Sequence, residues 1–242
     1  MPPAADAKPR KPLWRRLLRW CVIAGLVWIA LSFLLVLILR FVPPPTSAFM
    51  LERRLIAWRS GEQNFANHYH FVAWDRLGGE LPIALVAGED QKFPNHHGFD
   101  VQAIQDALDE ADEGERLRGA STITQQTAKN LFLWGGRSFV RKGFEAYFTV
   151  LLELTWPKRR ILEVYCNIAE FGDGIYGADA ASNAFFRKAP AQLSAHEAAL
   201  LASVLPNPKK LHAERPSPYV LRHAEWVERQ VRQLGGAGYV SH

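Results

Sequence analysis

The chain has little cysteine: only Cys21 and Cys166. One lies in a long apolar run near the N-terminus and the other lies far along the chain, so they are not expected to pair, and a disulfide-bonded framework is excluded. Cys166 sits at an apolar position of a helical pattern, which predicts a buried, unreactive thiol. The sequence also lacks an H-E-x-x-H motif and any metal-binding cysteine pair, so no dedicated metal site is expected.

Most of the chain also lacks an excess of charge. The net charge is +5 at pH 7, and residues 1–19 carry all of it, with six lysines and arginines against Asp6. Residues 20–242 contain 23 basic and 23 acidic residues. The alkaline pI therefore belongs to the tail, and nothing in the balance supports binding to nucleic acid.

The one long uncharged run is Trp20–Leu39, a stretch of 20 residues. As a helix it would span roughly 30 Å, the thickness of a bilayer hydrocarbon core. A cleaved signal peptide remains an alternative, but its apolar core would be shorter, so residues 20–40 are predicted to be a permanent transmembrane helix. The basic tail before it predicts a cytoplasmic N-terminus. The chain after it would then lie in the periplasm, on the outer face of a bacterial inner membrane.

A short proline-rich linker is expected over residues 41–49, and one domain over residues 50–242. The signals in this domain are almost all helical. Apolar residues recur at helical spacing from Val101 to Ala111 and from Phe139 to Leu154. Two further helices are expected, one after a capping box of Ser194 and Glu197 and one after the capping residue Ser217. Only residues 70–74 indicate a possible strand, so the predicted class is mostly α.

The stretch "GEDQKFPNHHGFD", residues 88–100, brings an apolar run directly to two adjacent acids, Glu89 and Asp90. These acids could cap a helix, hold a metal together with the two histidines that follow, or be ordinary surface polarity. Adjacent histidines point apart on a helix or a strand, which disfavours the metal. An acid at the end of a buried helix has a raised pKa, as a general base requires.

The stretch "GASTITQQTAKNLFL", residues 119–133, predicts a helix capped by Ser121 or Thr122, with Gln125 completing a capping box with Thr122. Thr122, Gln126 and Lys129 would share one face, which presents a hydroxyl, an amide and an ammonium group. Such a face suits a sugar or a phosphate. A solvated polar face is the alternative, although such faces usually mix Glu and Lys.

Arg141 and Glu145 are four residues apart, and an exposed pair of this kind is worth only about 0.3–0.5 kcal/mol. Glu145 is flanked by aromatic residues, however, which predicts an acid in an apolar cleft with Arg141 and Lys142 beside it. The aromatic segment 130–140, with Phe132 and Trp134, is expected to dip into the outer leaflet. The polar, glycine-punctuated loop 110–120 is expected to be mobile over the cleft.

Five segments taken in order carry a family resemblance. They are Glu89-Asp90-x-x-Phe93-x-x-His96-x-Gly98-x-Asp100, then Ser121-Thr122-Ile123-Thr124-Gln125-Gln126-x-x-Lys129-Asn130-Leu131, then Arg141-Lys142-x-x-Glu145, then "KRRILEVYCNIAEFGDGIYGADAASNAFF" and "LLASVLPNPKKL". Over residues 50–215 they resemble glycosyltransferase family 51, the peptidoglycan glycosyltransferases. Ala120 stands where a second glycine is usual, and Thr127 and Cys166 stand where leucine is usual. The chain lacks S-x-x-K and K-T-G, so it resembles the monofunctional members.

The resemblance implies a lysozyme-like helical domain that polymerises lipid II into β-1,4-linked glycan with inversion, releasing undecaprenyl diphosphate. It implies catalytic roles for Glu89, as the base, and for Glu145. It implies no dedicated cofactor, although a divalent cation such as Mg²⁺ could assist at the diphosphate. The partners implied are lipid II, lipid-linked glycan, the membrane, and proteins of cell-wall synthesis or division. The implied substrate-binding residues are Asp90, Phe93, His96, Ser121, Thr122, Gln125, Gln126, Lys129, Asn130, Arg141 and Lys142.

Two other functions stay open at this point. A lytic, lysozyme-like muramidase would also use a pair of carboxylates. The cations Lys129, Arg141 and Lys142 argue against it, because a hydrolase that cuts finished glycan has no diphosphate to bind. A non-catalytic scaffold in the division or elongation machinery is the third reading, and the full set of acids and cations argues against it.

Overall fold

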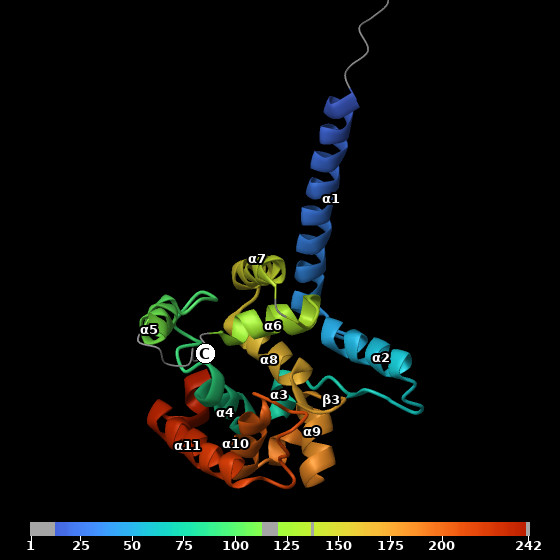
Figure 1. The fold of residues 1–242 in the computed structure, drawn as a ribbon. Coiled ribbons are helices and arrows are strands. Elements are labelled where there is room, and N and C mark those ends of the chain that lie inside the picture. The colour runs from blue at the N-terminus through green and yellow to red at the C-terminus, as the bar shows by residue number, and fades with distance from the viewer. Residues whose placement is uncertain (1–12, 113–120, 137, 241–242) are drawn as a thin grey trace, which may run out of the picture. The chain divides into compact units, whose positions relative to one another are not determined.

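The computed structural model describes residues 13–112, 121–136 and 138–240. The chain forms two compact units, Met1–Phe41 and Val42–His242 (Figure 1). Almost every regular element in the described residues is a helix, which confirms the mostly α class. The loop expected over 110–120 lies outside the described residues from 113 onward. The elements are α1 (Leu13–Phe41), α2 (Ala48–Ser60), β1 (His68–Tyr69), α3 (Trp74–Leu77), α4 (Glu80–Glu89), α5 (Val101–Asp112), α6 (Ile123–Phe132), α7 (Phe139–Thr155), α8 (Lys158–Ile168), β2 (Glu170–Gly172), β3 (Ile175–Tyr176), α9 (Gly177–Phe186), η1 (Pro190–Gln192), α10 (Ala195–Val204), α11 (Pro218–Leu234) and η2 (Gly236–Val240).

Helix α1 is, among the described residues, the one helix long and apolar enough to cross a membrane. It is compatible with a single-pass anchor, and it extends beyond the expected 20–40 at both ends. Helix α2 begins at Ala48, because the Ser47 side chain accepts a hydrogen bond from the backbone N–H of Met50. The connection between α1 and α2 is therefore residues 42–47, shorter than the expected 41–49.

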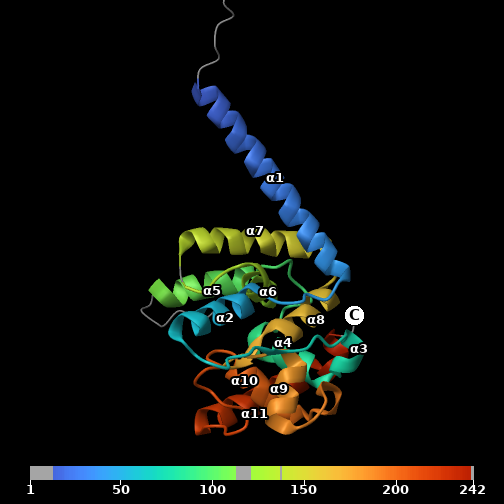
Figure 2. The same cartoon turned by 90° about the vertical axis from the view of Figure 1, so that its right-hand side faces the viewer.

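Helix α4 is the centre of the second unit. Every residue from Leu81 to Ala87 is buried, because the helix packs against α8, α10 and α11. Figures 1 and 2 show α6 and α7 on one side of α4 and α8, and α9, α10 and α11 on the other. A helix enclosed in this way is apolar all round its circumference, which explains the uninterrupted "LPIALVA" run.

The strand expected over 70–74 is wrong. Strand β1 ends at Tyr69, residues 70–73 belong to no helix or strand, and Trp74 begins α3. The buried side chain of Asn167 in α8 takes the place of a strand partner: its amide accepts from Val72 N at 2.7 Å and donates to Val72 O at 2.9 Å. Glu163 Oε1 accepts from Trp74 N at 2.7 Å. These side chains satisfy the backbone groups that a neighbouring strand would otherwise pair.

The sheet that does form is small and was not predicted. Its order is β1-β3-β2, with β1 parallel and β2 antiparallel to β3, and a bulge interrupts the β2 register. At the end of β3, Gly177 has φ +83, and a Cβ there would lie 2.2 Å from the carbonyl oxygen of Asn167. Glycine is thus required where the sheet packs against the end of α8.

The expected helix starts are confirmed. Ser194 and Glu197 form a capping box at α10, and Ser217 caps α11, which has Pro218 at its first position. Helix α11 ends at Gly235, a left-handed C-cap with φ 90.

Candidate active site

Glu89 is the last residue of α4, and the buried run Leu81–Ala87 carries it to the wall of a cavity of about 270 Å³. Burial raises the pKa of its carboxyl group. Two groups oppose that rise: the Gln126 amide, whose Nε2 donates to Glu89 Oε2 at 2.6 Å, and the charge of Lys129. The charge of Asp90 adds to it. A carboxylate in this setting can accept a proton from a group bound in the cavity.

Asp90 and His96 fix the loop that follows Glu89. Asp90 Oδ2 accepts from the backbone N–H of Ile123 at 2.9 Å, and Asp90 Oδ1 lies 2.9 Å from His96 Nε2. His96 Nδ1 accepts from Gly98 N at 3.2 Å. The network therefore assigns the imidazole proton to Nε2, which donates it to Asp90. Both side chains are largely buried, so they hold the loop against the start of α6 and beside the base.

Phe93 lies in the core, not in the cavity. It is 1 % exposed, and Lys158 Nζ lies 4.6 Å from the centre of its ring. Its ring also meets the His96 imidazole edge to face. The substrate contact expected of Phe93 is therefore wrong for this structure. The side chain packs beneath the loop and supports it.

The sequence placed Thr122, Gln126 and Lys129 on one face of α6, but Thr122 lies at the Glu89 cavity, whereas Gln126 and Lys129 line a second cavity. Thr122 and Gln125 are buried and form the predicted capping box. Thr122 Oγ1 also donates to Gly98 O at 2.6 Å, so its hydroxyl is used within the fold rather than turned to a sugar. Ser121 is exposed at the wall of the Glu89 cavity. Thr122 and Gln125 thus position the helix, while Ser121 is accessible to a ligand.

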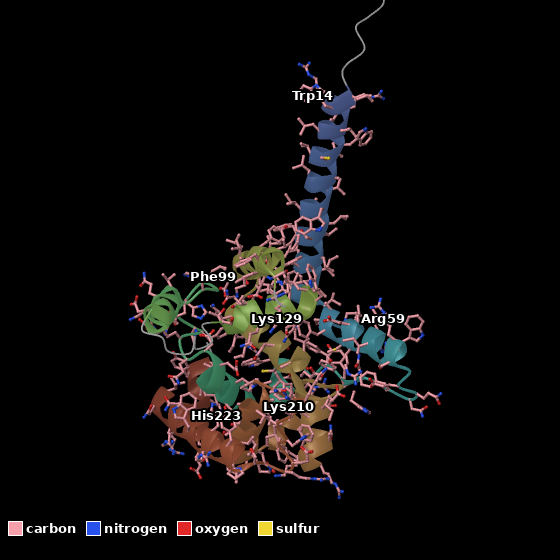
Figure 3. All side chains as sticks on the ribbon, in the orientation of Figure 1. Trp14, Arg59, Phe99, Lys129, Lys210 and His223 are labelled. Carbon is pink, nitrogen blue, oxygen red and sulfur yellow. The ribbon has the colours of Figure 1, made fainter. Side chains whose placement is uncertain are left out.

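A second cavity, of about 130 Å³, lies along α6 from Gln126 to Asn130. Gln126 belongs to both sides of the site: it donates to Glu89, and its Oε1 accepts from Tyr165 Oη at 3.0 Å. Lys129, labelled on α6 in Figure 3, also lines this second cavity. Sequence reasoning missed Tyr165 and Glu170, which line the same cavity from α8 and β2. Both lie in the fourth segment of the family resemblance, but only the tertiary fold shows that they reach α6.

The acid of α7 is held by two cations. Glu145 is 3 % exposed; Arg141 Nη1 lies 2.8 Å from its Oε2, and Lys142 Nζ lies 2.5 Å from its Oε1. Glu145 is thus buried as expected, but its carboxylate is paired and not free. The cleft expected around it stays a prediction. Within the described residues, Arg141 Nε is buried without a hydrogen-bond partner.

Lys129 connects the two acids electrostatically. Burial lowers the pKa of its ammonium group, while the charges of Glu145 and Glu89 raise it and those of Arg141 and Lys142 lower it. Two carboxylates and two other cations therefore act electrostatically on Lys129. Such a cluster suits a ligand with more than one negative charge, because its anionic oxygens would relieve the repulsion among the cations.

In the parts of the chain that the structure describes, no group of three or more His, Cys, Asp or Glu residues is arranged to hold a metal ion. The buried Cys166 thiol is 0 % exposed, and burial raises its pKa well above the usual range. Reactive cysteine chemistry is thus not available at this site.

Comparison with known proteins gives the family. A model of the transglycosylase family matches residues 58–232, most of the chain. The chain belongs to this family. A biosynthetic peptidoglycan transglycosylase of Xanthomonas axonopodis pv. citri is 55 % identical over 234 residues, which cover 97 % of this chain and 94 % of that protein. One of Xylella fastidiosa strain 9a5c is 51 % identical over 236 residues, which cover 98 % and 96 %.

Because transglycosylases are enzymes, the match identifies this chain as an enzyme. The matched residues include every acid and cation of the candidate active site, among them those on α4, α6 and α7. Residues 13–57, with α1 and the first ten residues of α2, lie before the match.

Proposed function

We propose that this enzyme is a peptidoglycan transglycosylase that extends a lipid-linked glycan strand with lipid II. The 4-hydroxyl of an acceptor lipid II attacks the anomeric carbon of the growing strand, a β-1,4 bond forms with inversion, and undecaprenyl diphosphate leaves. The names of the relatives and the motif resemblance support peptidoglycan as the polymer that is made. The juxtaposition of a proton-accepting acid and a cation cluster supports the chemistry, because this reaction needs both.

Glu89 is the proposed general base, and its burial is the observation that carries the proposal. Its raised pKa keeps the ionised carboxylate basic enough to take the proton of the attacking hydroxyl, and Gln126 holds one of its oxygens in place. Catalysis by such a base is typically worth about 10²–10⁴-fold. The acceptor sugar would occupy the cavity that Glu89 and Ser121 line.

The leaving diphosphate is proposed to meet Lys129, Arg141 and Lys142. Lys129 lines a different cavity from Glu89, and an inverting reaction needs separate places for the attacking hydroxyl and the leaving group. Arg141 Nε is buried without a hydrogen-bond partner among the described residues, and a phosphate oxygen that reached it would satisfy it. Glu145 orients Arg141 and Lys142 by pairing with both. A divalent cation, if it assists, would be bound by the diphosphate itself, since the Glu145 oxygens are already paired.

Helix α1 is proposed to anchor the enzyme in the inner membrane, with the N-terminus in the cytoplasm and residues 42–242 in the periplasm. Only some residues of segment 130–140, which was expected to contact the outer leaflet, are exposed. Phe132 stacks on Phe148 and Leu133 is buried, whereas Trp134, Phe139 and Val140 are exposed. We assign the contact to the exposed residues.

The proposed activity excludes transpeptidation, for which the chain carries neither S-x-x-K nor K-T-G. The test is purified full-length protein with labelled lipid II, followed by muramidase digestion of the product. A polymer that muramidase degrades supports the proposal. Release of fragments from purified cell walls, with lipid II unconsumed, would instead identify the lytic alternative.

A further inference from the structure

Helix α2 carries an unpartnered apolar stripe that the transglycosylase chemistry does not use. Its buried face holds Met50, Arg53 and Ala57. At about 100° per residue, Leu51, Leu55 and Trp58 share a different face, within an arc of roughly 60°. All three are exposed, and Trp58 is 77 % exposed.

The cations on α2 are placed around this stripe. Arg54 and Arg59 are both exposed, and by helical geometry they flank the stripe on its two sides. Figure 3 shows Arg59 on α2, projecting outward. Buried Arg53 is different: it is paired with Asp173 and Glu62 inside the fold. Tryptophan and leucine on one face suit the apolar side of a membrane interface, and arginines on both edges of that face can reach the phosphates.

The chain itself keeps α2 near a bilayer. The connection from the end of α1 to the start of α2 is residues 42–47, which includes Pro43, Pro44 and Pro45. Even fully extended, the seven steps from Phe41 to Ala48 span at most roughly 25 Å. If α1 crosses the membrane, α2 begins within that distance of the membrane surface.

We propose that the Leu51, Leu55 and Trp58 stripe docks α2 on the outer leaflet, with Arg54 and Arg59 bound to lipid phosphates. This inference rests on the anchor role proposed for α1. Docking would hold the start of the catalytic unit against the membrane by a second contact, independent of the exposed residues Trp134, Phe139 and Val140. A second copy of the chain is the other possible occupant of the stripe, and the test separates the two.

The test is spin-label accessibility on the full chain reconstituted in vesicles of phosphatidylethanolamine and phosphatidylglycerol, in a Cys21→Ser background. Cys166 is buried and stays unlabelled while the protein is folded. Labels are placed by Leu55→Cys or, as the matched control, by Ile56→Cys. The two side chains are similarly exposed, 43 % and 49 %, but Ile56 points about 100° away from Leu55 around the helix.

We expect the label at position 55 to be accessible to oxygen and shielded from a water-soluble nickel chelate, and the label at position 56 to show the opposite. Equal access of the chelate to both positions would overturn the proposal. Shielding of position 55 from both reagents would also overturn it, because a protein surface would then cover the stripe. A label placed by Val27→Cys tests the anchor separately, since access of the chelate to that position would reject α1 as a transmembrane helix.

Discussion

Gln126→Met should move the acid limb of the pH–rate profile to higher pH. Methionine has nearly the shape of glutamine but cannot donate the 2.6 Å hydrogen bond that Gln126 makes to the Glu89 carboxylate. That bond lowers the pKa of Glu89 against the larger effect of burial. Its loss destabilises the ionised form alone, so the pKa rises, and the base is protonated over a wider range of pH.

The size of the shift follows from the strength of the bond. A hydrogen bond to a charged group is worth roughly 1.5–3 kcal/mol, and one pKa unit corresponds to about 1.36 kcal/mol. The limb should therefore move by about 1–2 units. Turnover measured well above the new pKa should largely recover, because the base is then ionised again. A variant that was merely misfolded would not recover.

The assay is kcat/KM for lipid II as a function of pH, for the wild type and for Gln126→Met. Tyr165→Phe is the matched control: it removes the hydroxyl that donates to Gln126 Oε1 and leaves the bond from Gln126 to Glu89 in place. Its limb should move less. An acid limb at the same pH in wild type and Gln126→Met would refute the assignment of Glu89 as the titrating base.

Three further outcomes are expected. Glu89→Gln should stabilise the fold at neutral pH, because the pKa of Glu89 is higher in the folded than in the unfolded state, and ionising it costs stability once the pH exceeds the unfolded-state pKa. Thermal denaturation should therefore show a gain in stability at neutral pH that vanishes at acid pH, and a gain independent of pH would contradict this. Lys129→Met should lower kcat by roughly 10²–10³-fold without loss of folding, because burial already disfavours the charge of this lysine. A near-normal kcat with lipid II would show that Lys129 does not bind the diphosphate. Asp90→Ala should cost about 1–3 kcal/mol in the free energy of unfolding, because it leaves the Ile123 N–H and the His96 imidazole without their acceptor. An unchanged free energy of unfolding in urea would show that these Asp90 contacts do not stabilise the fold.

The sequence predicted the elements whose signals are local. Capping boxes at Thr122 and Ser194 depend on residues three positions apart, and α4 depends on an unbroken apolar run, so both could be found in the chain alone. The raised pKa of Glu89 followed from the same run, because an acid at the end of a buried helix cannot be fully hydrated.

What the sequence could not supply depends on contacts across the chain. The strand expected over 70–74 failed because Asn167, far along the chain, satisfies the backbone of Val72. Strands of two or three residues carry no alternation to detect. Thr122 fits the motif as well as Gln126 does, but only the fold shows that its hydroxyl bonds to Gly98 while Gln126 reaches the acid.

The most direct test of the account is turnover of lipid II by Glu89→Gln in membranes, beside the wild type. The amide keeps the shape of the side chain and its contact with Gln126 but cannot accept the proton, so polymer formation should fall by about 10²–10⁴-fold while circular dichroism shows a folded protein. Polymerisation at the wild-type rate by this variant would contradict the role of Glu89 as the base.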